Sequence, residues 1–360
     1  MQAEQSIEAR QNTKPMKTPG HWLAHTPACN RAATTLATLA TLLLAAVSVP
    51  LFAADPAQNT VANYPNRPVR VISGSPGSTA DITARFIGQK LSERFKQQFV
   101  IDNRASGGGI IGAEIVANAP PDGHTLYVTG VNTQVSAPLL YKKVPFDPLK
   151  DFAPISLITN SGLLVVVIPS LGVNNMKEFV AYARARPHGL YYASASAGTS
   201  SHLTGELLAQ MLGLTFTHVP YKGAGFTLTA LMTGEVQAAF LSTTTTSGQI
   251  KAGKLKAIAL LNDKRFAGAP DIPTALEQGF KGLESYVWFG LYAPGKTPRA
   301  LIDKINREIG SILKLPETRD AMLLQGAEVV YTTPEEFDRF QRAEIVKWSK
   351  VIRDAKIQAQ

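Results

Sequence analysis

The stretch "VRVISGSPGSTAD", Val69 to Asp81, contains the structural unit that the rest of the chain repeats. Its first five residues, Val69–Ser73, are rich in β-branched side chains and predict a short strand. Residues 74–81 are rich in glycine and serine and predict a loop, and apolar residues at helical spacing follow from Ile82 to Leu91. Asp81 is placed to cap that helix. The stretch therefore predicts a strand, a loop and a helix in succession.

The same succession recurs along the chain of 360 residues. Further strands are predicted at 99–101, 126–129, 163–168, 190–194, 216–219, 236–241, 255–259 and 286–292. Thr297-Pro298 and the capping box Thr333-Pro-Glu-Glu336 are each expected to open a helix near the C-terminus, whereas the threonine run 243–246 is interpreted as a loop. Alternation of this kind predicts an α/β fold with mostly parallel sheets flanked by helices.

The order of the elements predicts two domains joined by two crossing strands. Domain 1 is expected to be discontinuous, comprising residues 64–164 and 286–360, and domain 2 to comprise residues 165–285. The strand at 163–168 would leave the first domain and the strand at 286–292 would return to it. Two crossing strands of this kind make a hinge, and a hinge between two domains places a cleft between them.

Residues 1–53 have the pattern of a cleaved signal peptide, and residues 54–63 are expected to be a linker. Arg31 precedes an uncharged, leucine- and alanine-rich stretch that ends in small residues near Ala53. A retained membrane anchor is the alternative, and a start at Met16 would give a leader of more usual length. The signal peptide would direct export of the protein, and its cleavage would remove the sole cysteine, Cys29. The net charge of +9 would fall to +7, because four basic and two acidic residues are removed.

The remaining charge and histidines exclude several classes of function. Basic residues form no long block and are not interleaved with aromatic residues, so nucleic acid is not expected as a partner. The histidines beyond residue 53 are scattered without the spacing of metal ligands. Loss of Cys29 would also exclude thiolate metal sites and cysteine nucleophiles. We therefore expect no metal and no cofactor. A small anion or an anionic membrane surface could meet a basic exported protein, but most of the charge is interpreted as a solvated surface with a modest excess of lysine and arginine.

A glycine motif, Gly107-x-Gly109-x-x-Gly112, follows the second predicted strand. A dinucleotide-binding fingerprint normally follows the first strand, with an acidic residue about twenty positions later to hold the ribose. The nearby acids here lie inside a helix (Glu114) or in a turn (Asp122), which argues against a nucleotide. A structural turn and an anion cradle both stay open for this loop, because glycine amides can hold a carboxylate as well as a phosphate.

Two other loops are better placed to hold an anion. Loop 1, residues 73–81, follows the first strand, and loop 2, residues 194–202, follows a strand of the second domain. Both contain small hydroxylated residues and lead into a helix, whose N-terminus carries partial positive charge. Facing each other across a cleft, they would clamp a small anion from both sides. The alternative, that both are only well-capped turns, stays open.

A serine hydrolase is the competing function. The sequence Gly198-Thr-Ser200-Ser-His202 has the first glycine and the serine of a nucleophile elbow, but His202 occupies the position of the second glycine. Residues two apart on a helix do not face each other, so His202 would be badly placed to deprotonate Ser200. We therefore expect a binding protein rather than an enzyme.

Ten short motifs, taken in order, resemble the Bug/TctC family, the extracytoplasmic solute receptors of tripartite tricarboxylate transporters. The motifs are "PGSTAD" from Pro76, "NRASGGGIIGAE" from Asn103, "PDGHTL" from Pro121, "DFAPI" from Asp151, "HLTGEL" from His202, "HVPYKG" from His218, "IKAGKLKAIA" from Ile250, "WFGL" from Trp288, "APGKTP" from Ala293 and "TPEEF" from Thr333. The resemblance covers about Tyr64 to Ile357. It implies a two-domain periplasmic binding protein of the Venus-flytrap type that closes on a carboxylate.

The resemblance also implies how the ligand is held and what receives it. Backbone amides, hydroxyls and water from loops 1 and 2 would bind the carboxylate, and inner-membrane permease subunits would receive it from a monomeric receptor. A sensor that presents its closed form to a signalling partner is a further alternative. The residues expected to contact the ligand are Ser75, Gly77, Ser78, Thr79, Gly198, Thr199, Ser200 and His202, with Leu241, Ser242 and Thr243 shaping the far wall.

Three departures from the family pattern bear on the ligand. Ser78 replaces a glycine common in the first loop, and Gly74 stands where a bulky aromatic residue commonly ends the first strand. The vacated volume suits a larger, even aromatic, carboxylate. The sequence "AFLS", residues 239–242, lacks the aspartate found in members that bind amino acids. An α-amino acid is disfavoured, because its buried ammonium group would have no partner.

Overall fold

The computed structural model describes residues 61–104, 109–186 and 189–357. The expected signal peptide with Cys29, most of the linker, Gly107 and His188 lie outside the described residues. The chain divides into the units Met1–Ala53 and Ala54–Gln360, and the fold below is that of the second unit.

The first lobe contains three parallel strands in the order β2-β1-β3. Strand β1 (Val69–Ser73) leads through loop 1 into α2 (Thr79–Phe95), and β2 (Phe99–Asn103) is followed by α3 (Ile110–Ala117). Strand β3 (Thr125–Gly130) leads directly into a short π-helical turn, η2 (Asn132–Ser136), and then α4 (Ala137–Leu140). The apolar residues of α2 pack on one face of this sheet, as the helical spacing in the sequence predicts.

The second lobe repeats the pattern. Strand β5 (Leu190–Ser194) pairs in parallel with β6 (Phe216–Pro220) and β7 (Ala238–Ser242). Loop 2 joins β5 to α6 (Ser200–Leu212). The other elements of this lobe are η3 (Pro169–Leu171), α5 (Met176–Arg184), α7 (Ala224–Met232), α8 (Thr243–Lys251) and β8 (Lys256–Leu260).

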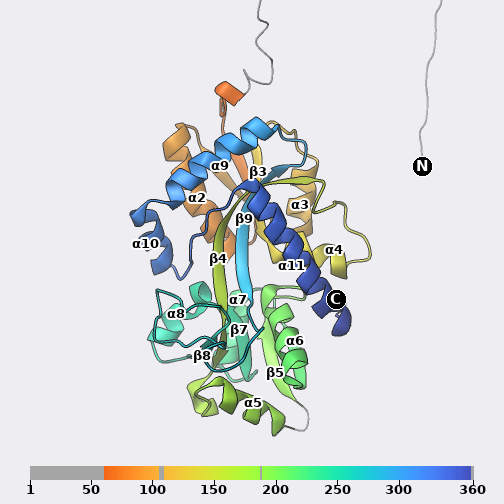
Figure 1. Ribbon diagram of the computed structural model, residues 1–360, viewed down its shortest axis with the longest axis vertical. Coiled ribbons are helices and arrows are strands. Elements are labelled where there is room, and N and C mark those ends of the chain that lie inside the picture. The colour runs from red at the N-terminus through yellow and green to blue at the C-terminus, as the bar shows by residue number, and fades with distance from the viewer. Residues whose placement is uncertain (1–60, 105–108, 187–188, 358–360) are drawn as a thin grey trace, which may run out of the picture. The chain divides into compact units, whose positions relative to one another are not determined.

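Two long strands connect the lobes. Strands β4 (Phe152–Val167) and β9 (Tyr286–Pro294) pair antiparallel from Phe152↔Pro294 to Gly162↔Tyr286 and run side by side through the middle of Figure 1. The sheet is therefore mixed, with the order β2-β1-β3-β9-β4-β7-β5-β6 and β8 paired to β4. Strand β9 matches the predicted strand at 286–292, whereas β4 begins at Phe152, eleven residues before the predicted strand at 163–168, and this earlier part is the one that pairs with β9.

The pairing partners of β4 and β9 set the direction of every other strand. Strand β3 is antiparallel to β9, so it runs along β4 toward the second lobe. Strand β7 is antiparallel to β4, so it runs toward the first lobe. The remaining strands of each lobe are parallel to these two. The carboxyl ends of the two sets of strands, with loops 1 and 2, therefore point toward each other.

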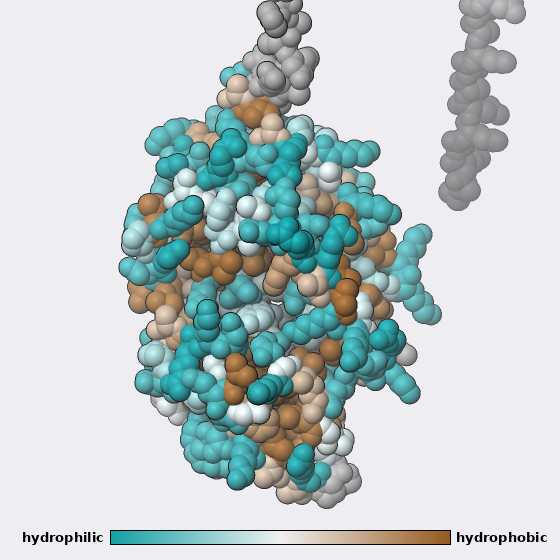
Figure 2. Space-filling model, in the orientation of Figure 1, coloured by the Kyte–Doolittle hydropathy of each residue, from teal (hydrophilic) through white to brown (hydrophobic). Residues whose placement is uncertain are grey.

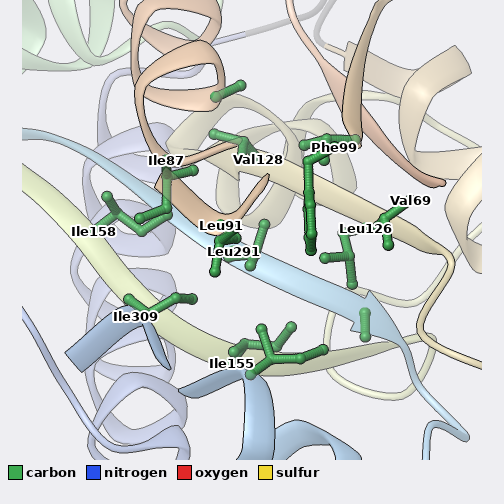
Figure 3. Close-up of a cluster of buried hydrophobic side chains, with 14 of the residues drawn as sticks. Val69, Ile87, Leu91, Phe99, Leu126, Val128, Ile155, Ile158, Leu291 and Ile309 are labelled. Carbon is green, nitrogen blue, oxygen red and sulfur yellow. The ribbon is translucent and has the colours of Figure 1, made fainter. Parts of the chain in front are cut away.

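The C-terminal helices cover both lobes. Helices α9 (Arg299–Leu313) and α10 (Pro316–Leu324) precede α11 (Pro334–Asp354), which begins at the predicted capping box of Thr333 and Glu336. Figure 3 shows the core between α2, α9 and the sheet, formed by residues such as Ile87, Leu126, Ile155 and Ile309.

Helix α11 packs on the opposite face of the sheet from this core. Glu344 accepts hydrogen bonds of 2.9 Å from the indoles of both Trp288 and Trp348. Gln210 on α6 donates to the carbonyl of Val351 at 3.1 Å. Helix α11 is thus bonded to the crossing strand β9 and to a helix of the second lobe.

Two local predictions were wrong. Asp81 is not the cap of α2, because the N-cap is Ser78, whose hydroxyl accepts from the Asp81 amide. The threonine run is not a loop but the first turn of α8, where Thr246 donates its hydroxyl proton to the carbonyl of Ser242 at 3.0 Å. Ser78 satisfies a helix-start amide, and Thr246 bonds back to the carbonyl four residues earlier, local contacts that composition alone does not reveal.

Hydrophilic side chains cover most of the face shown in Figure 2, and hydrophobic ones form scattered patches. No helix within the described ranges is long and apolar enough to cross a membrane.

Gly130→Ala is expected to destabilise the fold by about 1–3 kcal/mol, because the new methyl group would lie 2.1 Å from the carbonyl oxygen of Trp288 and push β3 away from β9. Gly248→Ala is the control, since Gly248 lies within α8 with open space around it and should gain roughly 0.5–1 kcal/mol. Urea unfolding measures both. If Gly130→Ala were as stable as Gly248→Ala, the added methyl group would not strain the pairing of β3 with β9, and the prediction would be wrong.

Candidate functional site

Loop 1 is organised around the buried carboxylate of Asp81. Its oxygens accept from the Gly77 amide and from Asn103 Nδ2, both at 2.8 Å, and pair with Arg85 at 3.0 Å. Burial alone would raise the pKa of Asp81, but the hydrogen bonds from Asn103, Arg85 and Gly77 together hold it below its ordinary value. Asp81 is therefore a charged anchor, and the amide of Gly77 is already occupied.

The free donors of loop 1 are the first amides of α2. Ser78 donates its amide to the carbonyl of Ser75 at 3.1 Å and its hydroxyl caps the helix. Within the described residues, the amides of Thr79 and Ala80 have no hydrogen-bond partner, as expected at a helix start. Ser75 and Gly77 are exposed, whereas Ser78 and Thr79 are half-buried. Loop 1 thus presents two amides and the partial positive charge of a helix N-terminus.

Loop 2 has the same design with a histidine in place of the aspartate. Gly198, at φ 74°, donates its amide to His202 Nδ1 at 3.0 Å. Thr199 caps α6 by accepting from the His202 amide. The amides of Ser200 and Ser201 and the hydroxyl of Ser200 have no partner among the described residues. Loop 2, like loop 1, therefore presents two helix-start amides, and it adds the hydroxyl of Ser200.

His202 is held neutral by its surroundings. Its ring stacks on that of His218, with centroids 3.7 Å apart and planes 7° apart. Burial lowers the pKa of His202 to about 4, and burial together with the nearby His202 lowers the pKa of His218 to about 3. Nδ1 of His202 already accepts from Gly198, so the ring positions loop 2 and does not act as a base for Ser200.

The three residues expected at the far wall make other contacts. Leu241 lies in an apolar cluster, and Ser242 shares a hydrogen bond of 3.0 Å with Thr245. Thr243 is buried and donates to the carbonyl of Gly326, between α10 and α11. The structure therefore shows Thr243 linking the second lobe to a C-terminal segment, and none of the three bonded to loop 1 or loop 2.

The π-helical turn η2 (Asn132–Ser136) and α4 (Ala137–Leu140) adjoin loop 2 and were missed in the sequence. A methyl group built on Gly198 would lie 2.6 Å from Leu140 Cδ1 and 3.2 Å from Ser136 Cβ. The polar run "NTQVS", residues 132–136, just after β3 is the signal that could have revealed this third strand-to-helix connection.

Lys222 is a second missed residue. It follows β6, and the amides on either side of it are bonded to the strand end that carries loop 2: Tyr221 donates to Ser194 at 2.9 Å and Gly223 donates to Ala195 at 2.8 Å. The Lys222 side chain is exposed. An exposed cation thus lies on the segment next to loop 2.

The glycine motif is used for packing. Gly109 adopts φ 78° at the start of α3, and its carbonyl accepts from the hydroxyl of Tyr127 at 3.0 Å. A methyl group on Gly112 would lie 3.1 Å from Ile72, so this glycine allows α3 to approach β1 closely. These contacts favour the structural-turn interpretation of the two glycines that the structure describes.

The family model of the tripartite tricarboxylate transporter family receptor, TctC, matches residues 83–357. The chain belongs to this receptor family. Protein BugT of Bordetella pertussis is 31% identical over 317 residues, which cover 87% of this chain and 97% of BugT.

Two solved structures from Rhodopseudomonas palustris share the fold. Rpa4515 with adipate has a TM-score of 0.78 and 32% identity, and the match covers 82% of this chain and 100% of that one. MatC with bound malate has a TM-score of 0.73 and 31% identity, covering 80% and 100%. The resemblance to Bug/TctC receptors is confirmed, as is the two-domain binding-protein fold. The family and its structural neighbours are receptors rather than enzymes.

Gly198→Ala is expected to cost more stability than Gly172→Ala, by roughly 1 kcal/mol or more. Both glycines have φ 74°, so both variants carry the same left-handed strain, but only Gly198 lacks space for a methyl group. Denaturant unfolding of the two variants separates the clash from the strain. Equal losses would mean that loop 2 does not press on Ser136 and Leu140.

Stability is expected to fall as pH drops from about 6.5 toward about 4, because the unfolded chain protonates His202 and His218 in this range while the folded protein holds both neutral. The double variant His202→Gln, His218→Gln lacks these groups and should lose less stability over the same range. Thermal melts at a series of pH values measure the difference. If the melting temperatures of wild type and the double variant fell equally with pH, the loss of stability would not come from His202 and His218.

Proposed function

We propose that the protein is a periplasmic receptor that captures a small carboxylate between its lobes. The lobes are the domains 64–164 with 286–360 and 165–285, and residues 1–53 and 54–63 are the signal peptide and linker. Loops 1 and 2 form the two sides of the site with Ser75, Gly77, Ser78, Thr79, Gly198, Thr199, Ser200 and His202, and Leu241, Ser242 and Thr243 shape its far wall.

The observation that carries this proposal is the pair of helix N-termini with unbonded amides. Strand directions turn the starts of α2 and α6 toward each other, and the amides of Thr79, Ala80, Ser200 and Ser201 have no partner among residues 61–104, 109–186 and 189–357. A helix N-terminus is equivalent to about half a positive charge, so two of them would stabilise one carboxylate from opposite sides. Gly77 and Gly198 contribute their left-handed backbone rather than their amides.

A di- or aromatic carboxylate fits better than an α-amino acid. The related receptors Rpa4515 and MatC are described with adipate and with malate. An ammonium group would need a free acid, and Asp81 is already bonded to Asn103, Arg85 and Gly77. Gly74 lacks the bulky side chain common at this position in the family, which suits a larger ligand, although a methyl group built there would lie 3.4 Å from Ser78 Oγ.

The receptor delivers its ligand, as a monomer, to tripartite tricarboxylate-type permease subunits in the inner membrane. The family of the chain supports this role, because its receptors are named for that transporter. A sensor that shows its closed form to a signalling protein would use the same loops. Permease genes or a histidine-kinase gene beside the receptor gene would distinguish the two.

Adipate, malate or benzoate is expected to raise the melting temperature by several degrees, whereas glucose and aspartate are not. A ligand at 100 times its Kd adds about 2.7 kcal/mol to the stability of a protein that binds it only when folded. Ser200→Ala should reduce the shift, while Ser311→Ala, in an exposed serine of α9, should not. A shift from glucose alone would overturn the proposal, and ester turnover that is lost in Ser200→Ala would revive the hydrolase.

A further inference from the structure

Ser136 presents an unsatisfied hydroxyl beside loop 2. The residue is 1% exposed, and its Oγ has no hydrogen-bond partner in the part of the chain that the structure describes. A methyl group built on Gly198 would lie 3.9 Å from this oxygen. Because β3 runs toward the second lobe and leads directly into η2, Ser136 reaches loop 2 from the opposite lobe. A buried hydroxyl without a partner is costly and calls for an explanation.

The turn that carries Ser136 is fixed in place by a chain of buried amides. Gln341 on α11 donates from Nε2 to the carbonyl of Pro148 at 3.3 Å and to Gln134 Oε1 at 3.0 Å, and Tyr292 donates to Gln341 Oε1 at 3.1 Å. A carbonyl oxygen can only accept, so Pro148 determines which way the Gln341 amide faces. That in turn orients Gln134 and holds η2 against α11 and β9.

We propose that η2 is a third ligand-binding segment, in which Ser136 Oγ donates a hydrogen bond to a carboxylate oxygen of the captured acid. Gln341 is a positioning residue, because it acts through the turn and not on the ligand. Gln134 holds the turn through its Oε1, while its buried Nε2 also has no partner among the described residues. The inference rests on the proposed carboxylate function and adds a side-chain donor from the first lobe opposite Gly198. Closure of the lobes on the acid gives the Ser136 hydroxyl the partner that it lacks here.

Ser136→Ala tests the inference through two effects of opposite sign. Removal of an unsatisfied buried hydroxyl should raise the melting temperature of the ligand-free protein. Removal of a donor to a charged oxygen should weaken binding of adipate, malate or benzoate roughly ten- to hundredfold in calorimetric titration. Thr318→Val is the matched control, since the Thr318 hydroxyl on α10 is also buried and unpartnered. It should raise the melting temperature without changing affinity.

Ser136→Cys keeps nearly the same volume with a weaker donor, and should give intermediate affinity even if the alanine variant folds poorly. If wild type binds one of the three acids and both Ser136 variants bind it equally well, the Ser136 proposal is overturned and the carboxylate function stands. If wild type binds none of them, the carboxylate function falls and the inference with it. Parallel loss of stability and affinity in Ser136→Ala would indicate a structural role and would also overturn the proposal.

Discussion

The antiparallel pairing of β4 with β9 is the constraint on which the rest of the structure depends. Both strands cross from one lobe to the other, and each lobe attaches its own parallel strands to one of them. Because β3 lies on β9 and β7 lies on β4, the two parallel sets run in opposite directions and their loops converge. Within the described residues, the chain passes between the lobes through these two strands. Side-chain hydrogen bonds add further links, such as Gln210 on α6 with Val351 on α11 and Thr243 with Gly326.

Loops 1 and 2 have the same hydrogen-bonding pattern but use different side chains. In each, a left-handed glycine donates its amide to a side chain four residues later, Asp81 in loop 1 and His202 in loop 2. This internal bond shapes the turn and leaves the next two helix amides unbonded. These amides carry no formal charge, and main-chain donors at a helix start suit an anion, as the proposed site requires.

The order of strands and helices could be predicted from the sequence, because hydrophobic periodicity and the alternation of strands with helices are local signals. Loops 1 and 2 could be predicted as strand-to-helix connections, since glycine and serine gather between a strand and a helix there, and their contact with a ligand stays a prediction. The sequence could not show which amides are free. Gly77 and Gly198 were expected to donate to the ligand, but their amides already donate to Asp81 and His202. Contacts such as Ser136 with Gly198 depend on tertiary packing, which periodicity does not report.

A crystal structure of the protein with a bound carboxylic acid tests the central claim most directly. We expect the carboxylate oxygens to lie within hydrogen-bond distance of the amides of Thr79 or Ala80 on one side and of Ser200 or Ser201 on the other. A carboxylate paired with the side chain of Lys222 or of another cation, with these four amides facing elsewhere, would contradict the account.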